Sequence, residues 1–230
     1  MSGAGLGTIA LLLVWGIITG VDLVSVPQAM LSRPLVAATV AGAILGDVEA
    51  GLRVGVILEL FALDVLPVGA VRYPDYGPAS VGAAAVVAGA PWEMTLGVGV
   101  GVGLIVATVG GWSLLLLRRV NAHAVQRHTA SLQAGDSDAI RRLHYAGIAR
   151  DVLRSLVLAA LALGAAGIAV RSARPDRETA IALTIAAVGA GAASALGGAL
   201  RGAGVGSRRR WLLIGGAVGT IVGVFVWGVR

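Results

Sequence analysis

The chain has 230 residues, of which 57% are hydrophobic and only 13% are charged. Soluble domains average about 25% charged residues, so this composition excludes a soluble globular protein and indicates an integral membrane protein. The formal net charge of +6 comes from arginines that fall between hydrophobic segments, which is typical of membrane orientation rather than of nucleic-acid binding. Because no cysteine is present, disulfides, thiolate metal sites and cysteine-based phosphoryl carriers are excluded.

Uncharged stretches of nearly the ~20 residues that cross a bilayer recur along the chain. The first, residues 3–21, lacks the basic start of a signal peptide, so we expect a retained helix. The later stretches are residues 94–117, 155–170 (extended by 151–154), 179–200 and 211–229, with shorter apolar pieces at 34–46 and 79–92. We therefore predict an all-α, polytopic membrane protein, a single domain over residues 1–230, with about six spans plus broken or re-entrant helices.

Residues 26–80 depart from this pattern, because prolines, glycines and charges interrupt the apolar sequence. Each charge at membrane depth costs roughly 2.5–3.5 kcal/mol on insertion scales and is retained mainly where it faces a pathway or a partner. Secondary transporters build substrate sites from broken helices of this kind. We therefore expect the substrate region here, among Arg33, Asp47, Glu49, Arg53, Glu59, Asp64, Arg72 and Asp75.

Glu59 stands alone in the apolar sequence GVILELFAL. At this position its carboxylate must find a hydrogen-bond donor or stay protonated. A carboxylate that accepts from two hydroxyls is a usual way to hold a sugar, which favours a binding role. A structural ion pair with Arg33 or Arg53 is the alternative interpretation, and the sequence leaves both open.

Two further residues are candidates for the same site. Asp75, in YPDYGP, either binds a ligand or caps the helix that begins near Pro78. Gln28 places an amide in an apolar run, where it can both donate to and accept from a hydroxylated ligand.

Arg33, Asp47 and Asp64 are possible supporting polar residues of this region. Asp47, together with Glu49, suits a turn and helix cap between two short helices. Arg33, immediately before a proline, suits a structural role in which it donates to carbonyl groups at a helix break.

The longest polar segment, residues 118–154, carries seven arginines against three aspartates, so we expect a cytoplasmic loop. Asp136 or Ser137 is suited to cap a helix through residues 139–149. The segment is either a solvated connector or a docking surface for a soluble partner. Its histidines fit no metal-ligand spacing and are interpreted as ordinary polar residues, so no metal site is predicted: His123, His128 and His144.

Glycine is abundant, with 35 residues. Gly97, Gly99, Gly101 and Gly103 alternate within one expected span, and four-residue spacing recurs at Gly215, Gly219 and Gly223. Small residues at such spacing let helix backbones approach closely, either within the chain or between subunits.

The stretch RPLVAATVAGAILGDVEAGLRVGVILELFALDVLPVGAVRYPD resembles the membrane component IIC of the mannose/fructose/sorbose family of the bacterial phosphotransferase system. The match runs without gaps from Arg33 to Asp75. The elements in register are Arg33-Pro34-Leu35, Leu45-Gly46-Asp47, Gly51-Leu52, Leu58-Glu59-Leu60, Val68-Gly69-Ala70 and Pro74-Asp75. Asp64, Pro67 and Arg72-Tyr73 depart from the family pattern.

The resemblance implies a sugar permease subunit of the bacterial inner membrane that binds sugar through Glu59, Asp75 and Gln28. It implies a IID-type membrane subunit as partner, a trimer of IIC–IID heterodimers, and soluble IIA and IIB carriers that supply the phosphoryl group. The chain itself then needs no cofactor and no phosphorylated residue. The alternative is a divergent relative that acts as a facilitator or as a regulatory or structural subunit, without coupling to phosphorylation.

Overall fold

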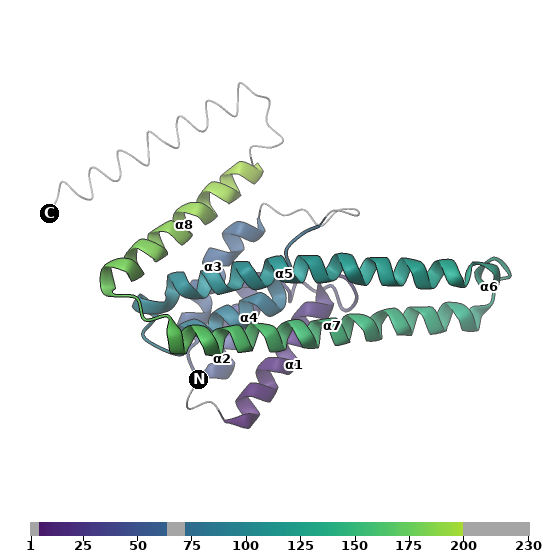
Figure 1. The fold of residues 1–230 in the computed structure, drawn as a ribbon, viewed down its shortest axis with the longest axis horizontal. Coiled ribbons are helices and arrows are strands. Elements are labelled where there is room, and N and C mark those ends of the chain that lie inside the picture. Colours follow the sequence, from purple (N-terminus) through teal and green to yellow (C-terminus); the bar gives the residue numbers. More distant parts are fainter. Residues whose placement is uncertain (1–4, 64–71, 200–230) are drawn as a thin grey trace, which may run out of the picture.

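The computed structural model describes residues 5–63 and 72–199, and this part of the chain is helical, without strands. The prediction of an all-α fold is confirmed for these residues (Figure 1). The helices are α1 (Leu6–Asp22), α2 (Pro34–Leu45), α3 (Val48–Ala62), α4 (Tyr76–Val87), α5 (Trp92–Arg127), α6 (Thr129–Gln133), α7 (Ser137–Ser172) and α8 (Arg177–Ala199).

Three helices, α5, α7 and α8, are long and apolar enough to cross a membrane. They contain the predicted stretches 94–117, 155–170 and most of 179–200. The shorter apolar helices α1, α2 and α4 correspond to the other expected pieces. The predicted stretch 211–229 lies outside the described residues, and the total of about six spans stays a prediction.

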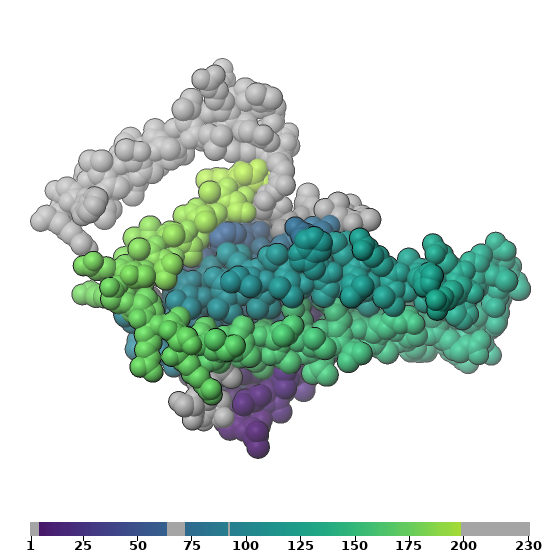
Figure 2. Space-filling model, in the orientation of Figure 1, coloured from purple at the N-terminus to yellow at the C-terminus, as the bar shows by residue number. Residues whose placement is uncertain are grey.

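Helices α5 and α7 run side by side and project as a hairpin, closed by α6, from the body that the other helices form (Figure 2). The predicted loop 118–154 is thus mainly the polar ends of two 36-residue helices. The predicted cap is confirmed at Asp136, whose carboxylate accepts hydrogen bonds from the backbone N–H groups of Asp138 and Ala139 at 2.9 and 3.1 Å.

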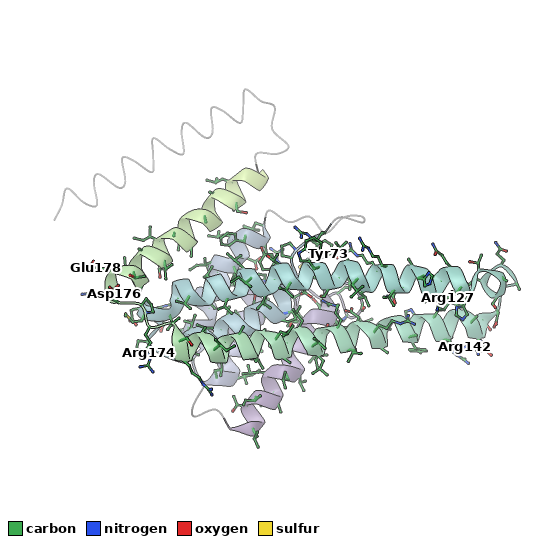
Figure 3. The ribbon with its side chains drawn as sticks, in the orientation of Figure 1. Tyr73, Arg127, Arg142, Arg174, Asp176 and Glu178 are labelled. Carbon is green, nitrogen blue, oxygen red and sulfur yellow. The ribbon has the colours of Figure 1, made fainter. Side chains whose placement is uncertain are left out.

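Charged side chains mark both ends of the long helices. Arg127 and Arg142 lie near the hairpin tip, and Arg174, Asp176 and Glu178 lie at the opposite end, where α7 leads into α8 (Figure 3). Hydrogen bonds from Thr179 lower the pKa of the exposed Asp176 carboxyl, which stands just before the first residue of α8. The apolar parts of α5 and α7 lie between these two polar ends, as a membrane-spanning pair requires.

Helix α4 forms the centre of the body, and every one of its residues is buried. A helix that is apolar and small-sided all round is suited to burial rather than to a surface. Helices α1, α2, α3, α5 and α7 all contact it.

Helix α5 packs closely against three other helices through its glycines. Gly97 faces Leu183 on α8, Gly99 faces Val87 on α4, and Gly103 faces Leu58 on α3. These three glycines therefore serve packing within the chain, whereas Gly101 meets open space and the 215–223 series lies outside the described residues.

Helices α2 and α3 form a tight pair joined at Gly46, which adopts the left-handed conformation with φ 81°. The predicted role of Asp47 as a turn and cap residue is confirmed, because its carboxylate accepts from the Ala50 N–H at 2.9 Å at the start of α3. The two helices touch backbone to backbone at Gly51, where an added Cβ would lie 2.3 Å from the carbonyl oxygen of Ala38.

Gly51→Ala should therefore destabilise the protein by about 1–3 kcal/mol, because the clashing atom belongs to rigid backbone and the helices must separate. Gly164→Ala on α7 is the matched control, since an added Cβ there meets nothing within 4 Å. Replacing a helical glycine in open space should leave stability unchanged or raise it by about 0.5–1 kcal/mol. Thermal melts of the two purified variants test this, and equal melting temperatures would contradict the packing assigned to Gly51.

Candidate functional site

The connection between α1 and α2 is an irregular loop held in place by Asp22. The buried Asp22 carboxylate accepts hydrogen bonds from the backbone N–H groups of Ala29 at 2.7 Å and Ser32 at 2.9 Å. The loop passes through left-handed backbone conformations at Gln28 and Met30, with φ 59° and 62°. Sequence reasoning gave Asp22 no role, although a carboxylate at a helix end before a proline-containing loop is a recognisable signal for such anchoring.

A cavity of about 400 Å³, here called the loop cavity, lies where this loop meets the end of α3 and the segment before α4. Gln28 and Arg33 line it from the loop, and Tyr73 and Tyr76 line it from the other wall. The side chain of Gln28 is exposed and makes no hydrogen bond with the described residues. Its amide is therefore available to a ligand in this cavity.

Glu59 lies in the last turn of α3, with 18% of its side chain exposed. One carboxylate oxygen accepts from the guanidinium of Arg33, and the other accepts from the Leu35 N–H at 3.1 Å. The structural ion pair that the sequence left open is thus present with Arg33, whereas Arg53 pairs with Glu49 on its own helix. Among the described residues, Arg33 donates to the Glu59 carboxylate on α3 and not to the carbonyl groups at the helix break, where donation was expected.

Asp75 is completely buried behind the loop cavity, between Pro74 and Tyr76, which line it. It stands at the N-cap position of α4, yet its side chain makes no capping hydrogen bond. Instead, Oδ2 accepts from the Arg154 guanidinium at 2.7 Å. Oδ1 is buried and has no hydrogen-bond partner among the described residues.

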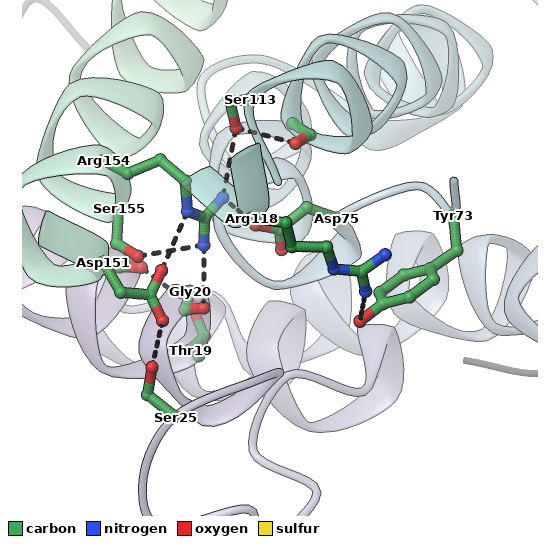
Figure 4. Close-up of polar contacts among 12 residues, drawn as sticks. Thr19, Gly20, Ser25, Tyr73, Asp75, Ser113, Arg118, Asp151, Arg154 and Ser155 are labelled. Carbon is green, nitrogen blue, oxygen red and sulfur yellow. Dashed lines mark hydrogen bonds and ion pairs between the residues drawn. The ribbon is translucent and has the colours of Figure 1, made fainter. Parts of the chain in front are cut away.

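Arg154 is the centre of a buried polar network (Figure 4). It donates to Asp151 at 2.8 Å, to the Gly20 carbonyl oxygen at 3.0 Å and to the Ser113 hydroxyl at 3.2 Å. Asp151 in turn accepts from the Ser25 hydroxyl at 2.5 Å. One guanidinium therefore links α1, α5, α7 and the start of α4, and it faces two buried carboxylates.

The segment before α4 is extended and lies along α5. The Asp75 N–H donates to the Ala107 carbonyl oxygen at 2.9 Å. This approach requires glycine on α5, because a Cβ at Gly110 would lie 2.6 Å from the Asp75 Cβ, and one at Gly111 would lie 2.6 Å from the Tyr73 carbonyl oxygen. Sequence analysis did not single out this glycine pair.

Arginine–aromatic contacts fix the same segment on its outer side. The Arg118 guanidinium donates to the Tyr73 hydroxyl at 2.7 Å and lies 4.8 Å from the ring centroid. The guanidinium of Arg72 stacks on Trp112, 4.2 Å from its ring centroid. Such cation–π contacts contribute about 0.5–2 kcal/mol each. They make Tyr73 a rigid wall of the loop cavity.

The predicted site residues thus divide into three groups. Gln28 and Arg33 line the loop cavity, and Glu59 forms an ion pair with Arg33. Asp75 lies behind the wall, engaged with Arg154. Asp47 is at the opposite end of α3 from Glu59, about 18 Å away along the helix axis, and Asp64 lies outside the described residues. Among the residues that the structure describes, no group of three His, Asp or Glu side chains could hold a metal ion.

The described residues form a helical integral membrane protein, with a cavity at the α1–α2 loop that both polar and apolar side chains line. Comparison with models of protein families identifies the family to which this membrane protein belongs. The family model of the sorbose-specific IIC component of the phosphotransferase system matches residues 6–214, and the chain belongs to this family. The resemblance drawn from residues 33–75 is thereby confirmed.

Two relatives in this family are about one-third identical to the chain over the aligned residues. The fructose permease IIC component of Bacillus subtilis (strain 168) is 32% identical over 149 residues, covering 65% of this chain and 54% of the relative. The sorbose-specific EIIC component of Klebsiella pneumoniae is 36% identical over 106 residues, covering 46% of this chain and 38% of the relative. The chain thus spans about half the length of these relatives or less.

Two solved structures share the fold. One, titled "Structure of membrane protein", has a TM-score of 0.69 at 19% identity, and the match covers 99% of this chain and 97% of that one. The other is a chain of the mannose transporter ManYZ in complex with microcin E492, with a TM-score of 0.61 at 21% identity and the same coverage.

Proposed function

We propose that this chain is the sugar permease subunit, IIC, of a phosphoenolpyruvate-dependent phosphotransferase system in the bacterial inner membrane. It binds a hexose-type sugar and moves it across the membrane while partner subunits phosphorylate it. The observation that carries the proposal is the family match over residues 6–214, which includes all the described residues that line the loop cavity.

The loop cavity has the size and the chemistry for a sugar. Its volume of about 400 Å³ falls within the 300–1,000 Å³ typical of small-molecule sites. A carboxylate offers about four lone-pair sites, and Glu59 uses two of them, on Arg33 and on the Leu35 N–H. Glu59 does not itself line the cavity but pairs with Arg33, which does. In this proposal the remaining lone pairs of Glu59 accept sugar hydroxyls, while the Gln28 amide donates to or accepts from another hydroxyl.

Asp75 enters this proposal as a second carboxylate ligand. Its Oδ1 is an acceptor without a donor, and the Pro74 and Tyr76 that flank it already line the cavity. In this proposal Oδ1 accepts a hydroxyl of the bound sugar. The Arg154 guanidinium donates to Oδ2 and so orients the carboxylate.

The phosphoryl group, in this proposal, comes from soluble IIA and IIB carriers, so that this chain supplies binding and access but no covalent step. A sugar that leaves as a phosphate is trapped by its charge, which makes uptake effectively irreversible. The arginine-rich hairpin of α5 and α7 then lies in the cytoplasm. A IID-type membrane subunit is the partner, in a trimer of heterodimers.

The experiment that tests this function is co-expression with a IID-type subunit from the same genome, in cells that lack their own phosphotransferase for the sugar. We expect the two membrane subunits to co-purify and to support sugar uptake that depends on phosphoenolpyruvate and the soluble carriers. Uptake that proceeds without the carriers would instead establish a facilitator. A chain that supports no uptake with any sugar, although it co-purifies with the partner, would favour a regulatory or structural subunit.

A further inference from the structure

A second cavity, of about 590 Å³, lies next to the loop cavity and toward the base of the α5–α7 hairpin. It is here called the hairpin cavity. The two cavities share three lining residues, Leu23, Gln28 and Tyr73. These three residues therefore form the wall between the cavities. The remaining wall consists of the start of the α1–α2 loop and of facing residues on α5 and α7.

The hairpin cavity is lined by cationic and neutral polar groups. Arg118 and Asn121 contribute from α5, and His144 and Arg150 contribute from α7. No aspartate or glutamate is among the described residues that line it. The nearby Asp151 carboxylate directs its oxygens to Ser25 and Arg154 and does not line this cavity.

Arg150 is positioned to meet an anion. One terminal nitrogen of its guanidinium donates to the Asn121 side-chain oxygen at 3.0 Å, which fixes the planar group in place. This contact also occupies the acceptor of Asn121, so that its amide NH₂ remains a donor. Arg118 adds a second positive charge nearby while it remains bound to Tyr73. Guanidinium groups match phosphate oxygens in geometry and charge, and their hydrogen bonds to phosphate are about twice as strong as neutral ones.

We propose that the hairpin cavity binds a phosphate monoester, held by Arg150 with Asn121 and His144. This inference deepens the proposed function, because the phosphate monoester that fits the chain's position in uptake is the phosphorylated sugar. The sugar phosphate passes Gln28, the exposed residue of the shared wall, because its new charge of about −2 favours the cationic side. The phosphate headgroup of phosphatidic acid offers the same chemistry from the membrane, and the test separates the two sources.

Binding of mannose 6-phosphate, inorganic phosphate and free mannose is measured by isothermal titration calorimetry on the full chain co-purified with its IID-type subunit. A second arm measures retention of phosphatidic acid by native mass spectrometry. The test variant is Arg150→Gln. The matched control is Arg142→Gln on the same helix, whose side chain is exposed and whose nearest acidic oxygen, on Asp136, is 3.9 Å away. Arg118 is left intact, because its contact with Tyr73 is structural.

The wild-type complex should bind mannose 6-phosphate or inorganic phosphate. Arg150→Gln should weaken that binding about tenfold or more, as expected for one lost charge-assisted hydrogen-bonding group, while Arg142→Gln should stay within about twofold. Retention of phosphatidic acid that depends on Arg150, without soluble phosphate binding, would support the phosphate site and assign it to lipid. Absence of all phosphate binding, or equal losses in both variants, would overturn it.

These outcomes are separate from those of the proposed function. If free sugar binds and no phosphate compound does, the hairpin cavity proposal fails while the permease stands. If phosphate binds but no sugar binds or is transported, the phosphate site stands while the permease proposal fails.

Discussion

Replacing Arg154 with methionine should destabilise the protein by about 3–5 kcal/mol, because it leaves the buried carboxylates of Asp75 and Asp151 without their cation. The guanidinium is only 7% exposed, and the carboxylates are 0% and 1% exposed. Water therefore cannot replace the lost contacts. A penalty of this size approaches the whole folding stability of many domains, so we expect little monodisperse protein after purification.

The control for this prediction is Arg141→Gln, which breaks the exposed pair with Asp138 at 2.9 Å and should change stability by less than about 0.5 kcal/mol. Removing the charges together, as Asp75→Asn, Asp151→Asn and Arg154→Met, should restore part of the lost stability, since no isolated charge stays buried. Arg154→Met with a wild-type melting temperature would show that the network does not hold α1, α5 and α7 together.

Replacing Glu59 with glutamine should reduce sugar uptake about tenfold to a hundredfold with little loss of stability. The two effects separate because the carboxylate accepts charge-assisted hydrogen bonds from sugar, worth about 1.5–3 kcal/mol, whereas its pair with the partly exposed Arg33 contributes at most about 1 kcal/mol. Uptake of radiolabelled sugar and thermal melts of the purified complex give the two readouts.

Glu49→Gln is the matched control, since it removes the same charge from a glutamate of the same helix that also pairs with an arginine, Arg53. Uptake should be unchanged in this variant. If Arg33→Gln and Glu59→Gln lower the melting temperature alike and leave uptake intact, Glu59 is a structural partner of Arg33 and not a sugar ligand.

Local features of this fold were predictable because they depend on neighbours in sequence. Hydropathy located the apolar cores of α5, α7 and α8. The caps at Asp47 and Asp136 follow from residues three positions apart or closer. Proline and glycine located the breaks around α2 and α3, and the ungapped pattern from Arg33 to Asp75 indicated the family, which the match over residues 6–214 confirms.

The partners of the site residues were not predictable, because they depend on how distant helices pack. Asp75 and Arg154 are 79 positions apart, and no periodicity connects them. The extended contact of residues 72–75 with α5 depends on Gly110 and Gly111, which look like any other glycines in an apolar helix. The one local signal was the i, i+3 pair of Asp151 and Arg154, which stands just before an apolar stretch and so predicts a buried charge.

The choice between a sugar ligand and an ion pair at Glu59 also depended on tertiary structure. The pairing with Arg33 requires the α2–α3 crossing, which the close backbone contact at Gly51 makes possible. The structure shows that the carboxylate is only partly occupied by its two donors. Its role toward sugar stays a prediction that a binding measurement can decide.

The most direct test of the central claim is ligand-induced thermal stabilisation of the complex with its IID-type subunit, screened against hexoses, hexosamines and sorbose. We expect one sugar to raise the melting temperature, with a stabilisation that approaches about 2.7 kcal/mol at a hundredfold excess over Kd. The shift should persist in Glu49→Gln and disappear in Glu59→Gln. A monodisperse wild-type complex that no sugar stabilises would contradict the assignment of this chain as a sugar-binding permease subunit.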